Sequence, residues 1–147
     1  MSRWKEGLAV SMLLALGACA TVPLASPQAD QVGKQFDPPA EGSGAVYVYR
    51  PGYFALAKKV DVAIAGGAQA QLASNTYFRL EGPPGPIDIS CRADNTAGQE
   101  ITIQPGQVRY VEVAMNVGWI GPNCSVTEVS PQQGQAAIRN AKRVIPQ

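Results

Sequence analysis

Apolar and polar positions alternate in short runs from Ala45 to Val129, and glycine or proline interrupts the chain between runs. Because successive side chains of a β-strand point to opposite faces of a sheet, a period of two residues predicts half-buried strands. The predicted strands are 45–50, 59–64, 76–80, 87–92, 101–103, 108–115 and 125–129. About seven short strands with turn residues between them are typical of an antiparallel β-sandwich, so the predicted fold class is all-β.

A short helix is predicted after the last strand. Ser130 suits the position before a helix, Pro131 suits the first turn, and an alanine-rich stretch continues the helix to about Lys142. Gly134 should weaken this helix by roughly 1 kcal/mol relative to alanine. The folded domain is therefore expected to span residues 44–147, as a β-sandwich that ends in a short helix.

The segment 19–43 shows no sustained hydrophobic period, and proline, alanine, glutamine and glycine dominate it. Segments of this composition bury too little apolar surface to order themselves. The sequence therefore predicts a flexible tether, with a reach of about 25–30 Å if it behaves as a random coil.

A second apolar pattern lies at the start of the chain. Arg3 and Lys5 precede an uncharged run, residues 7–16, and two small residues follow it. This layout is typical of a secretory signal peptide, here residues 1–18. The run is too short for a transmembrane helix, which needs roughly 20 apolar residues.

The end of this run, Leu16-Gly17-Ala18-Cys19, resembles the lipobox of bacterial lipoproteins. The resemblance implies that Cys19 receives a lipid, that residues 1–18 are removed, and that the new amino terminus is acylated. Ala20 stands where an aspartate favours retention in the inner membrane, so the resemblance implies an outer-membrane protein. The alternative is an ordinary thiol at the end of a signal peptide.

With Cys19 assigned to lipid, Cys91 and Cys124 remain, in a compartment that permits disulfides. Both lie on the apolar side of predicted strands. A bridge between them would close a loop of about 34 residues and stabilise the fold by about 3–4 kcal/mol in the chain-entropy model. The alternative is two independent buried thiols.

The composition excludes several kinds of chemistry. The chain has no histidine, which removes the commonest general base and metal ligand, and its net charge of +1 offers no basic stripe for nucleic acid. Asp61, Asp88 and Glu112 alternate with apolar residues, so solvated face charges explain them better than a glycosidase pair. We therefore predict no catalytic, cofactor or metal-binding residue.

Two groups of residues are candidates for binding a partner. Tyr47, Tyr49 and Arg50 share one strand and could present a guanidinium and two rings to an acidic group, although Arg50 could instead pair with an acid at a sheet edge. Trp119 and Ile120 occupy a glycine-flanked loop that would contact a partner or membrane if exposed, or cap the core if folded back. The loop 53–56 raises the same question.

The strand region resembles a family of bacterial envelope proteins catalogued as domain of unknown function 2846, and its hairpins are similar, more loosely, to PEGA-type repeats. The segments that carry the resemblance are 44–51, 75–78, 84–89 and 103–111. Ala65-Gly66-Gly67 replaces the usual Asp-Gly turn of that family. The resemblance implies a β-sandwich lipoprotein and no particular activity.

These features predict a lipid-anchored outer-membrane protein that faces the periplasm and is not an enzyme. Its expected role is binding or structural, in contact with an envelope protein or glycan. The alternatives are a hydrolase of cell-wall glycan or lipid and a peptidoglycan- or carbohydrate-binding module. A flat face with Tyr47, Tyr49 and aromatic loops would favour binding, and a deep polar pocket with converging acids would favour hydrolysis.

Overall fold

The computed structural model describes residues 21–147. The predicted signal peptide, residues 1–18, and the predicted lipidation site, Cys19, lie outside the described residues. Within the described part of the chain, no helix is both long enough and apolar enough to cross a membrane.

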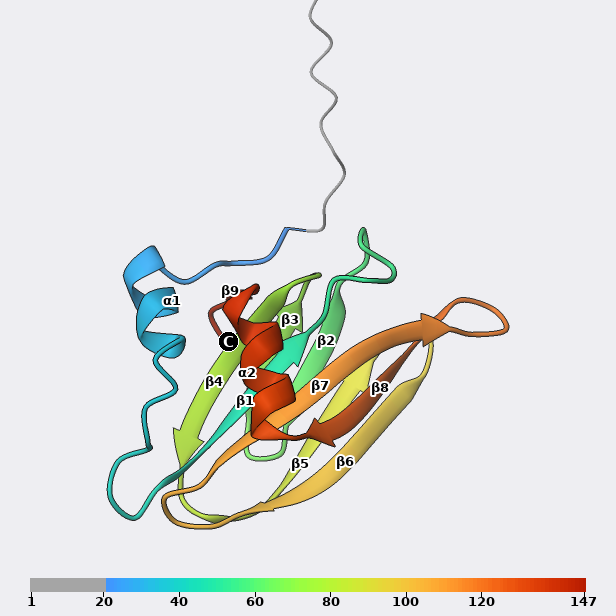
Figure 1. Ribbon diagram of the computed structural model, residues 1–147. Helices are drawn as coiled ribbons and strands as arrows, with labels where there is room; N and C mark the ends of the chain where they lie inside the picture. Colours follow the sequence, from blue (N-terminus) through green and yellow to red (C-terminus); the bar gives the residue numbers. More distant parts are fainter. Residues whose placement is uncertain (1–20) are drawn as a thin grey trace, which may run out of the picture.

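Over residues 21–147, nine strands form two sheets, with two short helices outside the larger sheet (Figure 1). The five-stranded sheet has the order β8-β7-β1-β4-β9, and the four-stranded sheet has the order β3-β2-β5-β6. The elements are α1 (Pro27–Gly33), β1 (Gly44–Arg50), β2 (Val60–Ile64), β3 (Ala68–Leu72), β4 (Thr76–Gly82), β5 (Gly85–Arg92), β6 (Thr96–Ile103), β7 (Val108–Val117), β8 (Pro122–Val129), α2 (Pro131–Arg139) and β9 (Lys142–Arg143). The predicted all-β sandwich with a short C-terminal helix is confirmed.

The strands differ from the prediction in number and in direction. β3 and β9 are additional, because alanine and glutamine give β3 a weak alternation and β9 is only two residues long. β1 pairs with β7 in parallel, and so does β4 with β9, so the larger sheet is mixed rather than antiparallel. Strands of the smaller sheet intervene along the chain between β1 and β7, which allows β7 to return in the direction of β1.

The main core lies between the two sheets. It contains the inward-facing side chains of both sheets, among them Val48, Leu72, Phe78, Ile89 and Val113, each no more than 1% exposed. Burial of each such side chain stabilises the fold by about 1.5–3 kcal/mol relative to exposure. The alternation that predicts the strands therefore reflects this interface.

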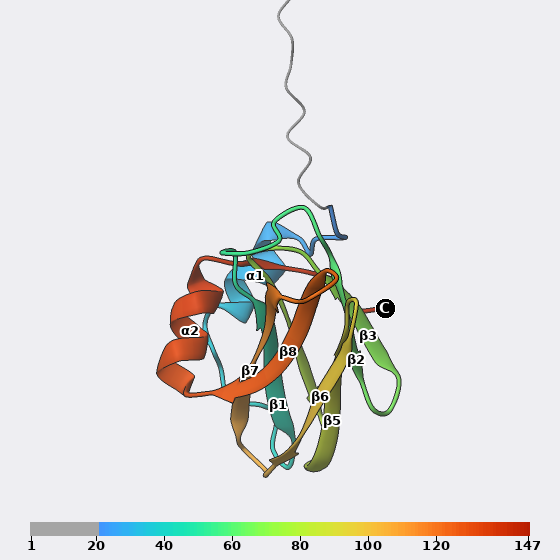
Figure 2. The same ribbon diagram turned by 90° about the vertical axis from the view of Figure 1, so that its right-hand side faces the viewer.

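A second core covers the outer face of the larger sheet. Tyr47, Tyr77 and Tyr110 project from β1, β4 and β7 and pack beneath the two helices together with Ile138. The rings of Tyr47 and Tyr110 stack with centroids 5.3 Å apart. Figure 2 shows α1 and α2 on the side of the larger sheet that faces away from the smaller one. This second layer explains why every residue of β1 is buried.

The prediction of a flexible tether over residues 19–43 is wrong for its described part. Helix α1 begins after Ser26, whose side chain accepts a hydrogen bond from the Ala29 N–H, and Pro27 occupies its first turn. Leu24 pairs with Val144, which ties the segment before the helix to the C-terminal end of the chain. The helix is too short to be stable alone, and its packing on the tyrosine rings of the sheet orders it.

Helix α2 begins as predicted and ends earlier. Ser130 accepts a hydrogen bond from the Gln133 N–H and Pro131 lies in the first turn. The helix ends at Arg139, and Lys142 and Arg143 form strand β9. Gly134 faces the sheet, where an added Cβ would lie only 2.6 Å from the Tyr110 ring. Glycine is therefore required here by close packing, at the expense of helix propensity.

Replacing Gly134 by alanine should destabilise the protein even though alanine is the better helix former. Alanine would gain about 1 kcal/mol of helix propensity, but overpacking against Tyr110 costs about 1–3 kcal/mol. We expect a net loss of about 1 kcal/mol in urea unfolding. The matched control is Gln132→Ala at an exposed position of the same helix, which should be neutral or slightly stabilising. A Gly134→Ala protein more stable than wild type would contradict this packing.

Candidate functional site

Three of the predicted partner-binding residues are buried and cannot contact a partner directly. Tyr47, Tyr49 and Arg50 are each 1% exposed. The sequence-based hypothesis assumed that β1 has a free face, whereas the helices cover its outer face, with Tyr47 and Tyr49, and the smaller sheet covers its inner face, with Arg50. The interpretation of these three residues as a binding face is therefore wrong.

Arg50 organises the loop that follows β1 instead of pairing with an acid. It lies on the same face as Val46 and Val48, so its side chain enters the interior between the sheets at their end. Its Nη1 donates to the Lys58 carbonyl at 2.5 Å and the Leu72 carbonyl at 3.2 Å. Its Nη2 donates to the carbonyls of Phe54 and Ala55, at 3.1 Å and 2.7 Å.

Backbone carbonyls therefore accept from both terminal nitrogens of Arg50, while its buried Nε has no partner among the described residues. Burial lowers its pKa from the ordinary value, but a guanidinium remains protonated in proteins. One side chain thus connects the 51–59 loop to β3, and the shape of that loop depends on it.

Tyr47 and Tyr49 also have structural partners. The Tyr47 hydroxyl donates to the Gly33 carbonyl at 2.7 Å, which attaches α1 to the sheet. The Tyr49 hydroxyl donates to the Glu112 carboxylate at 2.8 Å, across to the neighbouring strand β7. Burial, followed by the hydrogen bond and charge of Glu112, raises the pKa of Tyr49 well above its ordinary value.

The raised pKa of Tyr49 predicts how the stability of the protein changes with pH. An unfolded tyrosine ionises near pH 10, while the folded one keeps its proton, so the unfolded state binds fewer protons above pH 10. Tyr49 therefore stabilises the fold below that pH, and its contribution should fall by about 1.4 kcal/mol per pH unit above it.

The corresponding variant is Tyr49→Phe. We expect it to lose about 1 kcal/mol at neutral pH, for the missing hydrogen bond, and to show a shallower fall in stability above pH 10. Urea unfolding at pH 7, 10 and 11 measures both effects. An unchanged slope in the variant would contradict the assignment.

The three carboxylates considered for hydrolysis do not converge. Asp61 and Asp88 alternate with the inward-facing residues of β2 and β5 and lie on the outer face of the smaller sheet. Glu112 lies on the outer face of the larger sheet, where it accepts hydrogen bonds from Tyr49 and Tyr53. The two layers of the sandwich separate Glu112 from the other two, and Asp88 lies four residues along β5 from Arg92, the register partner of Asp61. Among residues 21–147, no three cysteine, aspartate or glutamate side chains gather closely enough to hold a metal ion.

Cys91 and Cys124 form a disulfide, with sulfur atoms 2.13 Å apart and Cα atoms 6.2 Å apart. The bond joins β5 of the smaller sheet to β8 of the larger one, and both cysteines are buried. Asn95 supports the same junction, because its amide donates to the Cys124 carbonyl and its oxygen accepts from the Cys124 N–H. The open alternative of two independent thiols is therefore excluded.

Trp119 and Ile120 form the exposed tip of the β7–β8 hairpin. Both side chains are fully exposed, so of the two alternatives left open by the sequence, the one in which Trp119 folds back onto the core is excluded. Pairing of the two strands continues to Val117 and Pro122, which carries the tip beyond the core. Gly118 and Gly121 lie too close to Asn123 and Asp94 for a Cβ, so the tip is closely packed at its base.

The 51–59 loop lies at the same end of the sandwich as this tip. β1 and β7 are parallel, so the segments that follow them leave the sheet at the same end. In the 51–59 loop, Tyr53 and Leu56 are exposed, and Lys58 and Lys59 are exposed next to them. We call the 51–59 loop and residues 118–121 together the loop end.

The described chain also begins at the loop end. Both views place its first residues beside the 51–59 loop, and Figure 1 shows the two at the top of the molecule. Val22 packs against the main core, and Leu24 pairs with Val144. The exposed aromatic tip, the lysine pair and the start of the described chain thus share one end of the strands, with the tip at the β8 edge of the larger sheet and the chain start near its β9 edge.

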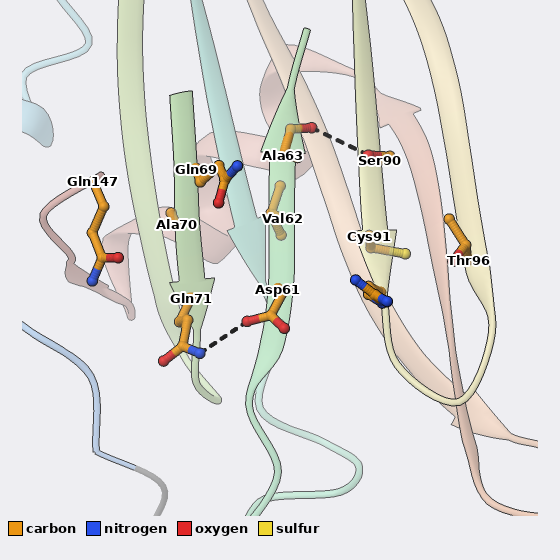
Figure 3. A pocket seen from close by; sticks show the side chains of 11 residues that line it. Asp61, Val62, Ala63, Gln69, Ala70, Gln71, Ser90, Cys91, Thr96 and Gln147 are labelled. Carbon is orange, nitrogen blue, oxygen red and sulfur yellow. Dashed lines mark hydrogen bonds between the residues drawn. The ribbon is translucent and has the colours of Figure 1, made fainter. Parts of the chain in front are cut away.

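A polar groove of about 450 Å³ crosses the outer face of the smaller sheet (Figure 3). Its floor is a row of residues in register, Gln69, Ala63 and Ser90. The neighbouring row contains Gln71, Asp61, Arg92 and Thr96. The Gln71 amide donates to the Asp61 carboxylate at 2.9 Å.

This groove is missed by the sequence analysis. The signal that could have predicted it is the polar residues at alternate positions of β2, β3 and β5. These residues share one face of the sheet once the register of the three strands is known. Its small central residues make a trough between longer polar side chains, which can exchange hydrogen bonds with a polar ligand.

No family model matches this chain. The chain is similar to an uncharacterized protein of Haemophilus influenzae, with 27% identity over 130 residues that cover 88% of this chain and 77% of the relative. This similarity names no substrate, ligand or partner.

Proposed function

We propose that this protein is a lipid-anchored accessory of the bacterial cell envelope that binds through its loop end and catalyses no reaction. The observation that carries the proposal is the full exposure of Trp119 and Ile120 on a closely packed hairpin tip. Adjacent exposed large apolar side chains commonly mark an interaction site. Trp119 is also of the residue type that most often anchors an interface.

The anchor in this proposal is a lipid on Cys19. Its support is the order of residues in Leu16-Gly17-Ala18-Cys19 after a short apolar run. The Cys91–Cys124 disulfide adds support, because such bonds persist in oxidising compartments such as the bacterial periplasm. Ala20 favours the outer membrane, and the segments similar to domain of unknown function 2846 favour an envelope protein.

The anchor is tested by Cys19→Ser in the full chain, expressed in a Gram-negative host. We expect mass spectrometry to find the wild-type chain cleaved before Cys19 and acylated on it, and the variant to be unacylated and released from washed membranes. The matched control removes the other two cysteines (Cys91→Ser with Cys124→Ser) and should remain acylated. An unprocessed wild-type amino terminus would overturn the proposal.

The binding surface is tested by photo-crosslinking in cells. A photoreactive amino acid in place of Ile120 should give crosslinks to an envelope component. The same amino acid in place of Thr102, an exposed residue at the opposite end of β6, is the matched control. Equal labelling at the two positions would contradict a binding role for the loop end.

A second candidate function is binding of a cell-wall glycan in the polar groove. The observation that favours it is the set of amide, hydroxyl and charged groups that line one trough, including Gln69, Gln71 and Ser90. Co-sedimentation with purified peptidoglycan tests it, with Ser90→Trp to fill the floor and Asn116→Trp on the other sheet as control. Equal sedimentation of the two variants and wild type would exclude the groove.

A further inference from the structure

We infer that the loop end contacts the surface of the membrane in which the lipid anchor is inserted. The sandwich would then be held against the membrane in one orientation. This inference rests on the proposed lipid at Cys19 and deepens the proposed function by naming the surface that Trp119 contacts. It follows from chain length, from the placement of the loops and from the chemistry of their exposed side chains.

Chain length provides the first argument. Val22 packs against the main core, and Leu24 is paired with Val144, so the folded domain begins within a few residues of Cys19. Three residues span at most about 11 Å when fully extended. A lipid on Cys19 would therefore hold this end of the domain within about 11 Å of the lipid headgroups, whereas a tether of 25 residues would not.

Placement provides the second argument. The described chain begins beside the 51–59 loop at the top of Figure 1, near the β9 edge of the larger sheet. The β7–β8 tip leaves the same end of the strands at the opposite, β8 edge, and projects to the right in Figure 1. A lipid on Cys19 would therefore bring the 51–59 loop toward the membrane first, and the exposed Trp119, at the other edge of the same end, would reach the lipid when that end lies flat on it. The opposite end of the sandwich, where β5 begins and β6 ends, would face away from the membrane.

Side-chain chemistry provides the third argument. Tryptophan concentrates at membrane interfaces, where its ring is apolar and its N–H can reach water or headgroups. Lys58 and Lys59 are exposed on the neighbouring loop, and lysines near an anionic leaflet contribute about 1 kcal/mol each. Asp61 and Asp94 lie beside them and oppose this attraction in part. The apolar tip and the short connection therefore contribute more to docking than the charge does.

The sequence supplies a specific reporter for the test. The chain has two tryptophans, Trp4 and Trp119, and Trp4 lies in the segment predicted to be removed. In the processed protein, tryptophan fluorescence therefore arises from the hairpin tip alone. The acylated protein is reconstituted into vesicles of phosphatidylethanolamine and phosphatidylglycerol, with and without brominated acyl chains.

We expect the emission of Trp119 to shift to shorter wavelength on these vesicles and to be quenched by the brominated lipid. The matched control moves the reporter to the opposite end (Trp119→Phe with Thr102→Trp), where emission should be unshifted and unquenched. Ile120→Asp should reduce the quenching of Trp119, because it places a carboxylate next to the inserted ring.

Two failures are distinguishable. An amino terminus that mass spectrometry finds uncleaved or unacylated would overturn the proposed anchor. If the protein is acylated but its Trp119 is quenched no more than the Thr102→Trp reporter, the contact between the loop end and the membrane is contradicted and the lipid anchor is not. Shielding of Trp119 that appears only after an envelope protein is added would also contradict this contact, in favour of a protein partner.

Discussion

Breaking the Cys91–Cys124 bond is expected to lower the free energy of unfolding by about 3–4 kcal/mol, because the bond closes a long loop in the unfolded chain. The bond also joins the two sheets, so its loss should separate the edge where β5 and β8 meet. For a domain of this size, such a loss is a large part of the total stability, which is typically about 5–15 kcal/mol.

The measurement is urea unfolding of the wild-type chain before and after reduction. The matched control is the double variant Cys91→Ala with Cys124→Ala, which should unfold at the same urea concentration with and without reductant. Asn95 lies beside the bond and hydrogen-bonds to the Cys124 backbone in both chains, so it cannot account for the difference. Equal unfolding midpoints for oxidised and reduced wild type would contradict the prediction.

Replacing Arg50 by methionine is expected to cost about 3–5 kcal/mol of stability. Methionine fills a similar volume but removes the guanidinium donors from the carbonyls of four residues, of which Ala55 keeps the Lys58 N–H. An unsatisfied buried acceptor costs about 1–3 kcal/mol, and relaxation of the 51–59 loop toward water should recover part of the sum. The loop should therefore open as the stability falls.

Hydrogen exchange and urea unfolding measure the two consequences. The Lys58 N–H donates to the Ala55 carbonyl within the loop and should exchange faster in Arg50→Met. Arg92→Met, at an exposed arginine near the same end, is the matched control and should change stability by less than about 0.5 kcal/mol. Equal stability of the two variants would show that Arg50 does not hold the loop.

Much of the fold follows from local patterns. Alternation in 45–50, 87–92 and 108–115 predicts strands that the structure contains, because one face of each strand packs in the main core. Ser130 and Pro131 predict the start of α2, because capping depends on neighbouring residues. The same Ser-Pro pair occurs at Ser26 and Pro27, and it is the signal that could have predicted α1 in a segment otherwise typical of a tether.

The candidate site was less predictable. Tyr47 and Tyr49 have the spacing of an exposed strand face, and they are buried because α1 and α2 pack on that face. Trp119 is a large apolar residue of the kind that often covers the end of a core. It is exposed because the strands on either side of it stay paired beyond the core. The first outcome depends on helices distant in the chain, and the second on how far the hairpin extends past the core that the two sheets form.

The sequence by itself determined seven of the nine strands over residues 21–147, the turns between them, the start of the C-terminal helix and the two cysteines available for a disulfide. These depend on periodicity and on residues that act over a few positions. Only the tertiary structure decided that β1 has two covered faces, that residues 21–43 belong to the folded domain, and that Trp119 shares an end with Lys58 and Lys59. The physical reason is that burial and proximity are set by contacts between segments far apart in the chain, which no local pattern encodes.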